Sequence, residues 1–344
     1  MNLFRVIAEP SKTHPNFRRA MHSAYKGARD VLSSWAEEFV DRDGKFVHEF
    51  QTTFNSGFWE LYVFAALKRF GFTPDLSFRV PDFVITHPYA FCIEAVIAQA
   101  AQGSCNEWER KLESFWGDLQ TLVRTPLVDQ ATVRLANAIS GKNEKFETQY
   151  SKLDHVRNKP FVIAVAPFEQ PFFYLQLNKA ILRVLFGYDG QPPESAEQVN
   201  QEHKARWTSS IRKPNGAEIP LGYFTNAQMP NISAVLFSNT ATFGKLQALS
   251  TDSQYRTMFQ VFRFDASTRC LVQKVHEKEE YQESLLDGLS VFYNPFATYA
   301  LPRALFGGSE VAHYSYDAEN GILRFDVPNN ALFHRLAATI APKD

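Results

Sequence analysis

The sequence predicts a mixed α/β fold in which helices flank a central β-sheet. Two apolar runs, Phe83 to Ile85 and Phe91 to Ile97, are separated by a short turn, and such runs are typical of strands. A helical pattern covers residues 130–150, and Phe161 to Ala166 is a further apolar run bounded by prolines. With the earlier strands the predicted order is β-β-β-α-β, in which the three runs named here are the last three strands, and this order favours a mixed sheet with helices packed on it.

Residues 1–44 are predicted to form an N-terminal helical segment. Apolar residues from Phe17 to Phe39 mark one face of a long amphipathic helix that ends at Asp43-Gly44. The first 30 residues carry six basic side chains against two acidic ones, so this segment is a candidate basic face for nucleic acid. The alternative is that these charges are simply solvated.

The next predicted helix carries an acid on its apolar face. It begins near Asn55-Ser56 and stops at Gly71. The neighbours of Glu60 three, four and seven residues further on are Val63, Phe64 and Leu67. Side chains at these spacings share one side of a helix, so Glu60 is expected to point along an apolar surface.

Two further acids lie in the strand pair. Asp82 follows Pro81 and opens the first apolar run, whereas Glu94 lies inside the second, which is predicted to be buried on both faces. A turn at His87-Pro88-Tyr89 would pair the strands antiparallel and bring Asp82 and Glu94 to the same region. A buried carboxylate is unfavourable unless it is paired, protonated or bound to a metal. Two such carboxylates are suitable ligands for Mg²⁺, which prefers oxygen.

An acid on a helix, then Pro81-Asp82, a tight turn, and Glu94 in a second apolar strand resemble the PD-(D/E)XK nuclease superfamily. The resemblance implies a restriction-endonuclease-like core over residues 45–190, in which Asp82, Glu94 and Glu60 hold Mg²⁺ or Mn²⁺ against a scissile phosphate. It also implies a lysine two residues after Glu94, but Val96 occupies that position. The match covers Glu60 to Glu94 and reaches only weakly beyond it.

A lysine from the following helix is the candidate replacement. In the 130–150 segment the apolar stripe is interrupted by Lys142, because it runs through Leu135, Ile139, Lys142 and Phe146. In some branches of the superfamily the catalytic lysine has moved to this helix, and Lys142 resembles such a case. Three alternatives stay open: Lys145 swings in instead, Lys142 extends to the surface along its aliphatic stem, or the site is inactive.

Residues 191–344 are predicted to be rich in strands. The runs at 311–316 and 322–327 flank a hairpin turn at Asp317 to Gly321. The run at 232–237 could extend the central sheet, so this part either completes the same domain or makes a second one.

The composition limits the class of protein. The chain has 344 residues and a net charge of −1, so nucleic-acid binding would need a local basic face. Its three cysteines, Cys92, Cys105 and Cys270, have no metal-ligand spacing, and their odd number argues against a disulfide framework. No apolar run is long enough to span a membrane and no signal peptide is recognised, so a cytoplasmic location is expected.

Together these patterns predict a metal-dependent nuclease that hydrolyses phosphodiester bonds, with DNA as the expected substrate and Asp82, Glu94, Glu60 and Lys142 as its site. The alternative is a catalytically inactive nuclease-fold protein that binds nucleic acid or a protein partner, and a homodimer is left open. A third interpretation is a structural protein or an unrelated enzyme in which the acids are accidental: Asp82 caps a turn, Glu94 pairs with a buried arginine, and Glu60 is solvated.

Overall fold

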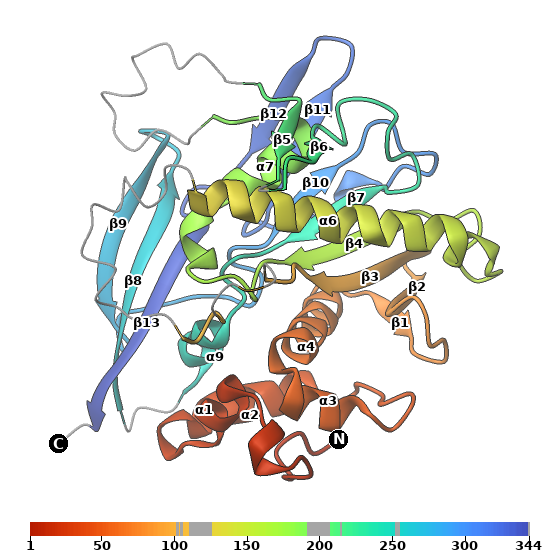
Figure 1. The fold of residues 1–344 in the computed structure, drawn as a ribbon. Helices are drawn as coiled ribbons and strands as arrows, with labels where there is room; N and C mark the ends of the chain where they lie inside the picture. Colours follow the sequence, from red (N-terminus) through yellow and green to blue (C-terminus); the bar gives the residue numbers. More distant parts are fainter. Residues whose placement is uncertain are drawn as a thin grey trace.

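A mixed sheet of eight strands forms the centre of the fold (Figure 1). The computed structural model describes residues 1–100, 103, 106–109, 126–190, 207–213, 215–251 and 255–342, so Cys105 lies outside the described residues. In spatial order the strands are β1 (Thr73–Asp75), β2 (Phe83–His87), β3 (Phe91–Ile97), β4 (Phe161–Ala166), β7 (Ala234–Phe237), β10 (Ser290–Tyr293), β11 (Ala312–Asp317) and β12 (Ile322–Asp326).

The middle of this sheet is parallel, and antiparallel pairs follow on both sides of it, although β10 and β11 again pair parallel. β3 pairs parallel with β4, and β4 pairs parallel with β7. β2 pairs antiparallel with both β1 and β3. Every residue of β4 is buried, which explains its uninterrupted apolar sequence. Strands from both halves of the chain therefore belong to one sheet, and β7, β10, β11 and β12 continue the sheet that β1–β4 begin.

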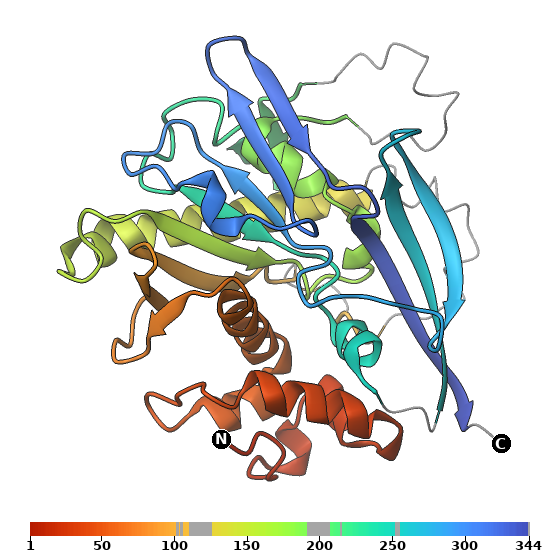
Figure 2. The same ribbon diagram turned by 180° about the vertical axis from the view of Figure 1, so that it is seen from behind.

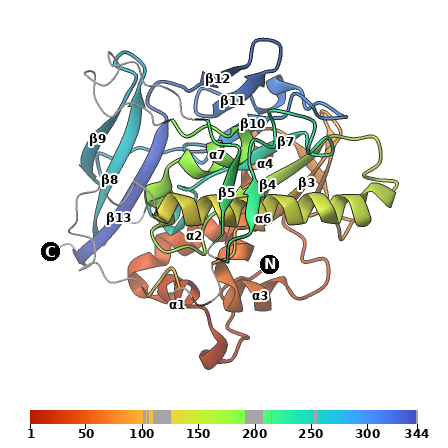
Figure 3. The ribbon, with the colours of Figure 1, turned by 45° about the horizontal axis from the view of Figure 1, so that its top comes forward.

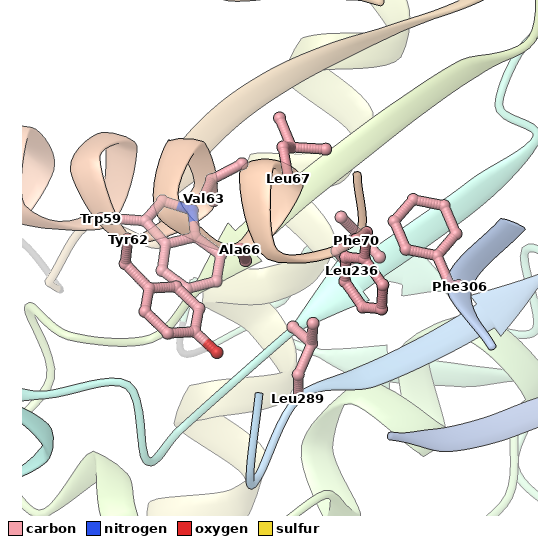
Figure 4. Close-up of a pocket in the computed structure, with 9 residues that line it drawn as sticks. All are labelled: Trp59, Tyr62, Val63, Ala66, Leu67, Phe70, Leu236, Leu289 and Phe306. Carbon is pink, nitrogen blue, oxygen red and sulfur yellow. The ribbon is translucent and has the colours of Figure 1, made fainter. Parts of the chain in front are cut away.

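Helices cover both faces of the sheet. α4 (Phe54–Arg69) packs on one face, against the side chains of Phe91 and Ile93 of β3. From this helix Trp59 donates a hydrogen bond of 2.9 Å to the carbonyl of Ala164. Figure 4 shows the side chains of α4 against Leu236, Leu289 and Phe306. α6 (Pro126–Thr148) and α7 (Lys179–Phe186) cover the other face, where Cys92 lies (Figure 3). The described elements keep the predicted order β-β-β-α-β through β4.

The N-terminal segment is helical, but the prediction of one long helix is wrong. It divides into α1 (Pro15–Met21), α2 (Lys26–Trp35) and, after residue 44, α3 (Phe46–Thr52). The break occurs at His22, whose backbone is extended and whose Nδ1 accepts a hydrogen bond from the amide of Ala24. This local hydrogen bond caps a new turn, so the apolar spacing across 17–39 is shared by separate helices.

The helical segment between residues 173 and 186 is also interrupted. A short 3-10 turn, η5 (Phe173–Gln176), precedes α7 because Leu177 has a positive φ of 52°. The other short turns are η1 (Pro10–Lys12), η2 (Ser23–Tyr25), η4 (Tyr150–Lys152) and η6 (Arg303–Phe306).

A second, three-stranded sheet stands beside the first and is seen from behind in Figure 2. Its order is β13 (Leu332–Pro342), β8 (Tyr255–Asp265) and β9 (Cys270–Glu277), and α9 (Phe243–Leu249) packs against β13. A two-stranded hairpin is formed by β5 (Ser210–Arg212) and β6 (Glu218–Pro220). Across the described ranges, no helix has the length and apolarity that a membrane crossing requires.

Candidate functional site

Asp82 lies where the β2–β3 ladder ends. The register pairs Phe83 with Ile93, and one further step places Asp82 opposite Glu94. The Asp82 Oδ2 accepts a hydrogen bond of 2.7 Å from the amide of Ala95, a donor on the strand beyond the end of β2. Burial raises the pKa of Asp82 to about 7, and the neighbouring Glu94 carboxylate adds to the increase.

Glu94 reaches the α6 face from the middle of β3. Its side chain is 3% exposed, and Oε1 accepts from Lys142 Nζ at 2.6 Å, from the Tyr150 hydroxyl at 2.9 Å and from Lys145 Nζ at 3.2 Å. The other oxygen, Oε2, is buried without a hydrogen-bond partner. A buried carboxylate oxygen without a donor is costly, so this atom calls for a ligand or a function.

Both lysines of the C-terminal half of α6 converge on this one oxygen. Lys142 is the less exposed of the two, at 21% against 36% for Lys145, and its contact with Glu94 is shorter. Lys145 also lies over the ring of Tyr150, with Nζ 4.8 Å from the centroid. The structure thus brings Lys142 and Glu94 together. Its shorter distance to Glu94 and its greater burial make Lys142 the better candidate of the two lysines.

Sequence reasoning missed Tyr150. The burial of this hydroxyl and its bond to Glu94 raise the pKa of Tyr150. A signal was present, because Tyr150 follows Lys142 and Phe146 at steps of four residues and so continues the same stripe.

Glu60 approaches the pair from α4 and is held by Arg42. The Arg42 guanidinium donates to Glu60 Oε1 at 3.2 Å, and its other terminal nitrogen donates to the carbonyls of Phe78 and Asp82 at 2.8 and 2.9 Å. Burial raises the pKa of Glu60 to about 8, with a further contribution from Asp82, while Arg42 opposes the shift. Arg42 therefore ties Glu60 to the backbone of Asp82. No sequence pattern pointed to Arg42.

The donor set fits a hard cation at two acids but not at three. Among the residues that the structure describes, no group of three or more His, Cys, Asp and Glu side chains could hold a metal ion. Glu60, already bound to Arg42, is not brought into a ligand set with Asp82 and Glu94. Mg²⁺ often takes only one or two protein carboxylates and completes its shell with water and phosphate oxygens. The pair Asp82 and Glu94, with the unpartnered Oε2, fits that pattern.

Two other positions in this strand pair have ordinary surroundings. Val96 is partly buried and packs with the apolar residues beneath α6. His87 is exposed at the far end of β2 from Asp82.

No protein-family model matches the chain, and searches of curated proteins and of solved structures find no significant match.

Proposed function

We propose that this protein is a metal-dependent nuclease that hydrolyses phosphodiester bonds in nucleic acid, with DNA as the expected substrate. One observation carries the proposal: Asp82 and Glu94 are neighbours across two strands, and an ammonium group, Lys142 Nζ, is 2.6 Å from Glu94. Two carboxylates and a lysine at one end of a strand pair form the constellation on which the PD-(D/E)XK resemblance rests. The element order around them supports the same reading.

In this proposal Asp82 and Glu94 hold Mg²⁺ or Mn²⁺. A metal in such a site polarises the phosphate and makes a bound water more acidic. Lys142 supplies positive charge next to Glu94 and orients the attacking water. It thereby takes the role of the lysine that the resemblance implies at position 96, where this chain has Val96. Tyr150 donates to the same Glu94 oxygen as Lys142 and so holds the carboxylate in place. Glu60 acts through Arg42, which positions the backbone of Asp82.

The second candidate function is binding without catalysis. It is favoured by the charge balance, because the cations Arg42, Lys142 and Lys145 equal the three carboxylates in number; Arg42 pairs with Glu60 and both lysines pair with Glu94. A site neutralised in this way needs no cation. The acid site and its surroundings would then contact nucleic acid or a protein partner without hydrolysing it.

Cleavage assays separate the two. The purified wild type and the Asp82→Asn variant are each incubated with plasmid DNA and with RNA, in Mg²⁺, Mn²⁺ or EDTA. The nuclease proposal expects metal-dependent cleavage by the wild type, loss of about 10²-fold or more in the variant, and a melting temperature that rises with Mn²⁺ only in the wild type. A wild type that cleaves neither substrate and whose melting temperature ignores Mn²⁺ would move the assignment to the binding-only candidate.

A further inference from the structure

A separate cavity of about 450 Å³ lies at the carboxyl edge of the parallel strands. Segments that follow these strands line it: Trp108 after β3, Phe168 after β4 and Phe243 after β7. Ligands of open α/β sheets bind outside the carboxyl ends of parallel strands, where such segments converge. None of the acid-site residues Asp82, Glu94 and Lys142 lines this cavity.

The walls of the cavity are unusually aromatic. Its aromatic lining residues are Phe54, Phe58, Trp108, Phe168, Phe172, Phe173, Tyr174 and Phe243. Phe54 and Phe58 stack with an interplanar angle of 21°. Flat aromatic faces favour planar ligands, because stacking a nucleobase on an aromatic side chain contributes about 1–3 kcal/mol.

One of these rings is held by an unfavourable backbone conformation. Phe172 is half-buried and has φ 58° and ψ 22°, in the left-handed region. A bulky residue rarely adopts this region, and such outliers cost about 1–3 kcal/mol and concentrate at ligand-binding sites. In this conformation Phe172 lines the cavity.

The lining of the cavity contains two polar features. In the first, Asn16 Nδ2 donates to Asn55 Oδ1 at 2.9 Å and to Glu107 Oε1 at 2.7 Å, which forms an amide–carboxylate cluster. The second is Arg19, three residues after Asn16 on α1, whose guanidinium lies 4.8 Å from the ring centroid of Phe243. The same guanidinium lies 5.1 Å from the ring centroid of Tyr25, and within the described part of the chain Arg19 makes no salt bridge, so no carboxylate neutralises its charge there.

We propose that this cavity binds a nucleoside monophosphate. The base lies among the aromatic rings with its polar edge toward Asn16, Asn55 and Glu107, and the phosphate lies against Arg19. The volume suits one small ligand, since such pockets measure about 300–1,000 Å³. The inference does not depend on the nuclease proposal, because the two sites share no residue.

The test is calorimetric titration with AMP and with adenosine, in EDTA so that no metal occupies the acid site. The wild type should bind AMP more tightly than adenosine. Arg19→Gln should lower AMP affinity about tenfold, to the level of adenosine, and leave adenosine binding unchanged. Arg18→Gln, one residue away on α1 and outside the cavity lining, is the matched control and should bind AMP normally.

A second variant separates binding from folding. Phe172→Gly removes the ring, while glycine favours the observed φ, so the melting temperature without ligand should fall little. AMP affinity should nevertheless fall about tenfold. Asp82→Asn should bind AMP as the wild type does, whether or not the protein proves to be a nuclease.

Three results would overturn the proposal. The first is no binding of AMP by the wild type at millimolar concentration. The second is equal loss in Arg19→Gln and Arg18→Gln, which would reduce the effect to general surface charge. The third is loss of AMP binding in Asp82→Asn, which would place the nucleotide in the acid site.

Discussion

Two parts of the molecule bury carboxylates, and their surroundings shift the carboxylate pKa values in opposite directions. Glu283 is fully buried beside the three-stranded sheet, and its Oε1 is bound by Arg335 at 2.6 Å and by Lys245. Tyr281 donates to its other oxygen. Burial alone would raise the pKa of Glu283, but Arg335 and Lys245 reverse the effect and lower it. At the acid site, burial and mutual repulsion instead raise the pKa of Asp82 and of Glu60.

The difference separates a structural cluster from the candidate functional one. Lys245 lies on α9 and Arg335 on β13, so the ion pairs with Glu283 join these elements, and every oxygen of the carboxylate has a donor. At the acid site Glu94 keeps an oxygen without a partner, and its neighbour Asp82 has a pKa near neutrality. Groups whose pKa is shifted toward the working pH concentrate at functional sites.

The largest expected effect tests the structural half of this comparison. Glu283→Gln removes the charged salt-bridge partner of the buried Lys245 and Arg335, and should lower the free energy of unfolding by about 3 kcal/mol or more in urea denaturation. Asp326→Asn is the control, because it breaks the exposed pair with Arg303 and should change stability by under about 1 kcal/mol. Similar losses in the two variants would show that the buried cluster has no special role.

The next effect tests the functional half. If Lys142 has replaced the missing lysine, Lys142→Ala should reduce cleavage by about 10²-fold or more. Folding should change little, because alanine favours a helix and the side chain is partly exposed. Lys145→Ala should keep most of the activity, since its contact with Glu94 is longer and more exposed. Unchanged cleavage by Lys142→Ala would refute the relocation of the lysine.

How far the sequence predicts the site depends on the range of the interactions. The strand pair and its turn are local features, so apolar runs and the proline turn were enough to place Asp82 near Glu94. Lys142 was found because a charge in an apolar stripe is a strong anomaly. Arg42 lies far from any such pattern, and its bonds to Glu60 and Asp82 exist only in the folded chain.

The same limit applies to the fold. Helix periodicity across residues 17–39 did not reveal the break at His22, because a single side chain-to-backbone hydrogen bond decides it. Strand runs near the C-terminus were recognised, but their distribution between the large sheet and the three-stranded sheet follows from long-range pairing. Period-two patterns specify strands without specifying partners.

A smaller effect concerns the pH dependence of stability without metal. The pKa of Asp82 is near 7 in the folded protein and lower in the unfolded chain, so the folded state binds the proton more tightly. The free energy of unfolding should therefore fall as the pH rises from the pKa of the unfolded chain, 3.8, to the folded value of about 7. Asp82→Asn keeps an acceptor for the Ala95 amide but cannot ionise.

The measurement is the melting temperature of both proteins in EDTA at pH 5 and pH 8. Asp82→Asn should melt no lower than the wild type at pH 8, and its relative advantage should shrink at pH 5. Asp75→Asn is the control, because the pKa of Asp75 is lowered by its hydrogen bonds to Ser77 and both pH values lie above it. A wild type whose stability relative to Asp82→Asn does not change with pH would contradict the raised pKa.

The smallest expected effect decides the role of Glu60. Its raised pKa of about 8 means that the carboxyl is largely protonated at neutral pH, and Glu60→Gln imitates that form while keeping an oxygen for Arg42. Because Glu60 is bound to Arg42 and not to the Asp82–Glu94 pair, cleavage by Glu60→Gln at pH 7 should fall by less than about tenfold. The two proteins should diverge above pH 8, where Glu60 ionises and glutamine cannot. A loss of about 10²-fold at pH 7, equal to that of Asp82→Asn, would instead make Glu60 a third metal ligand, released from Arg42 when the cation binds.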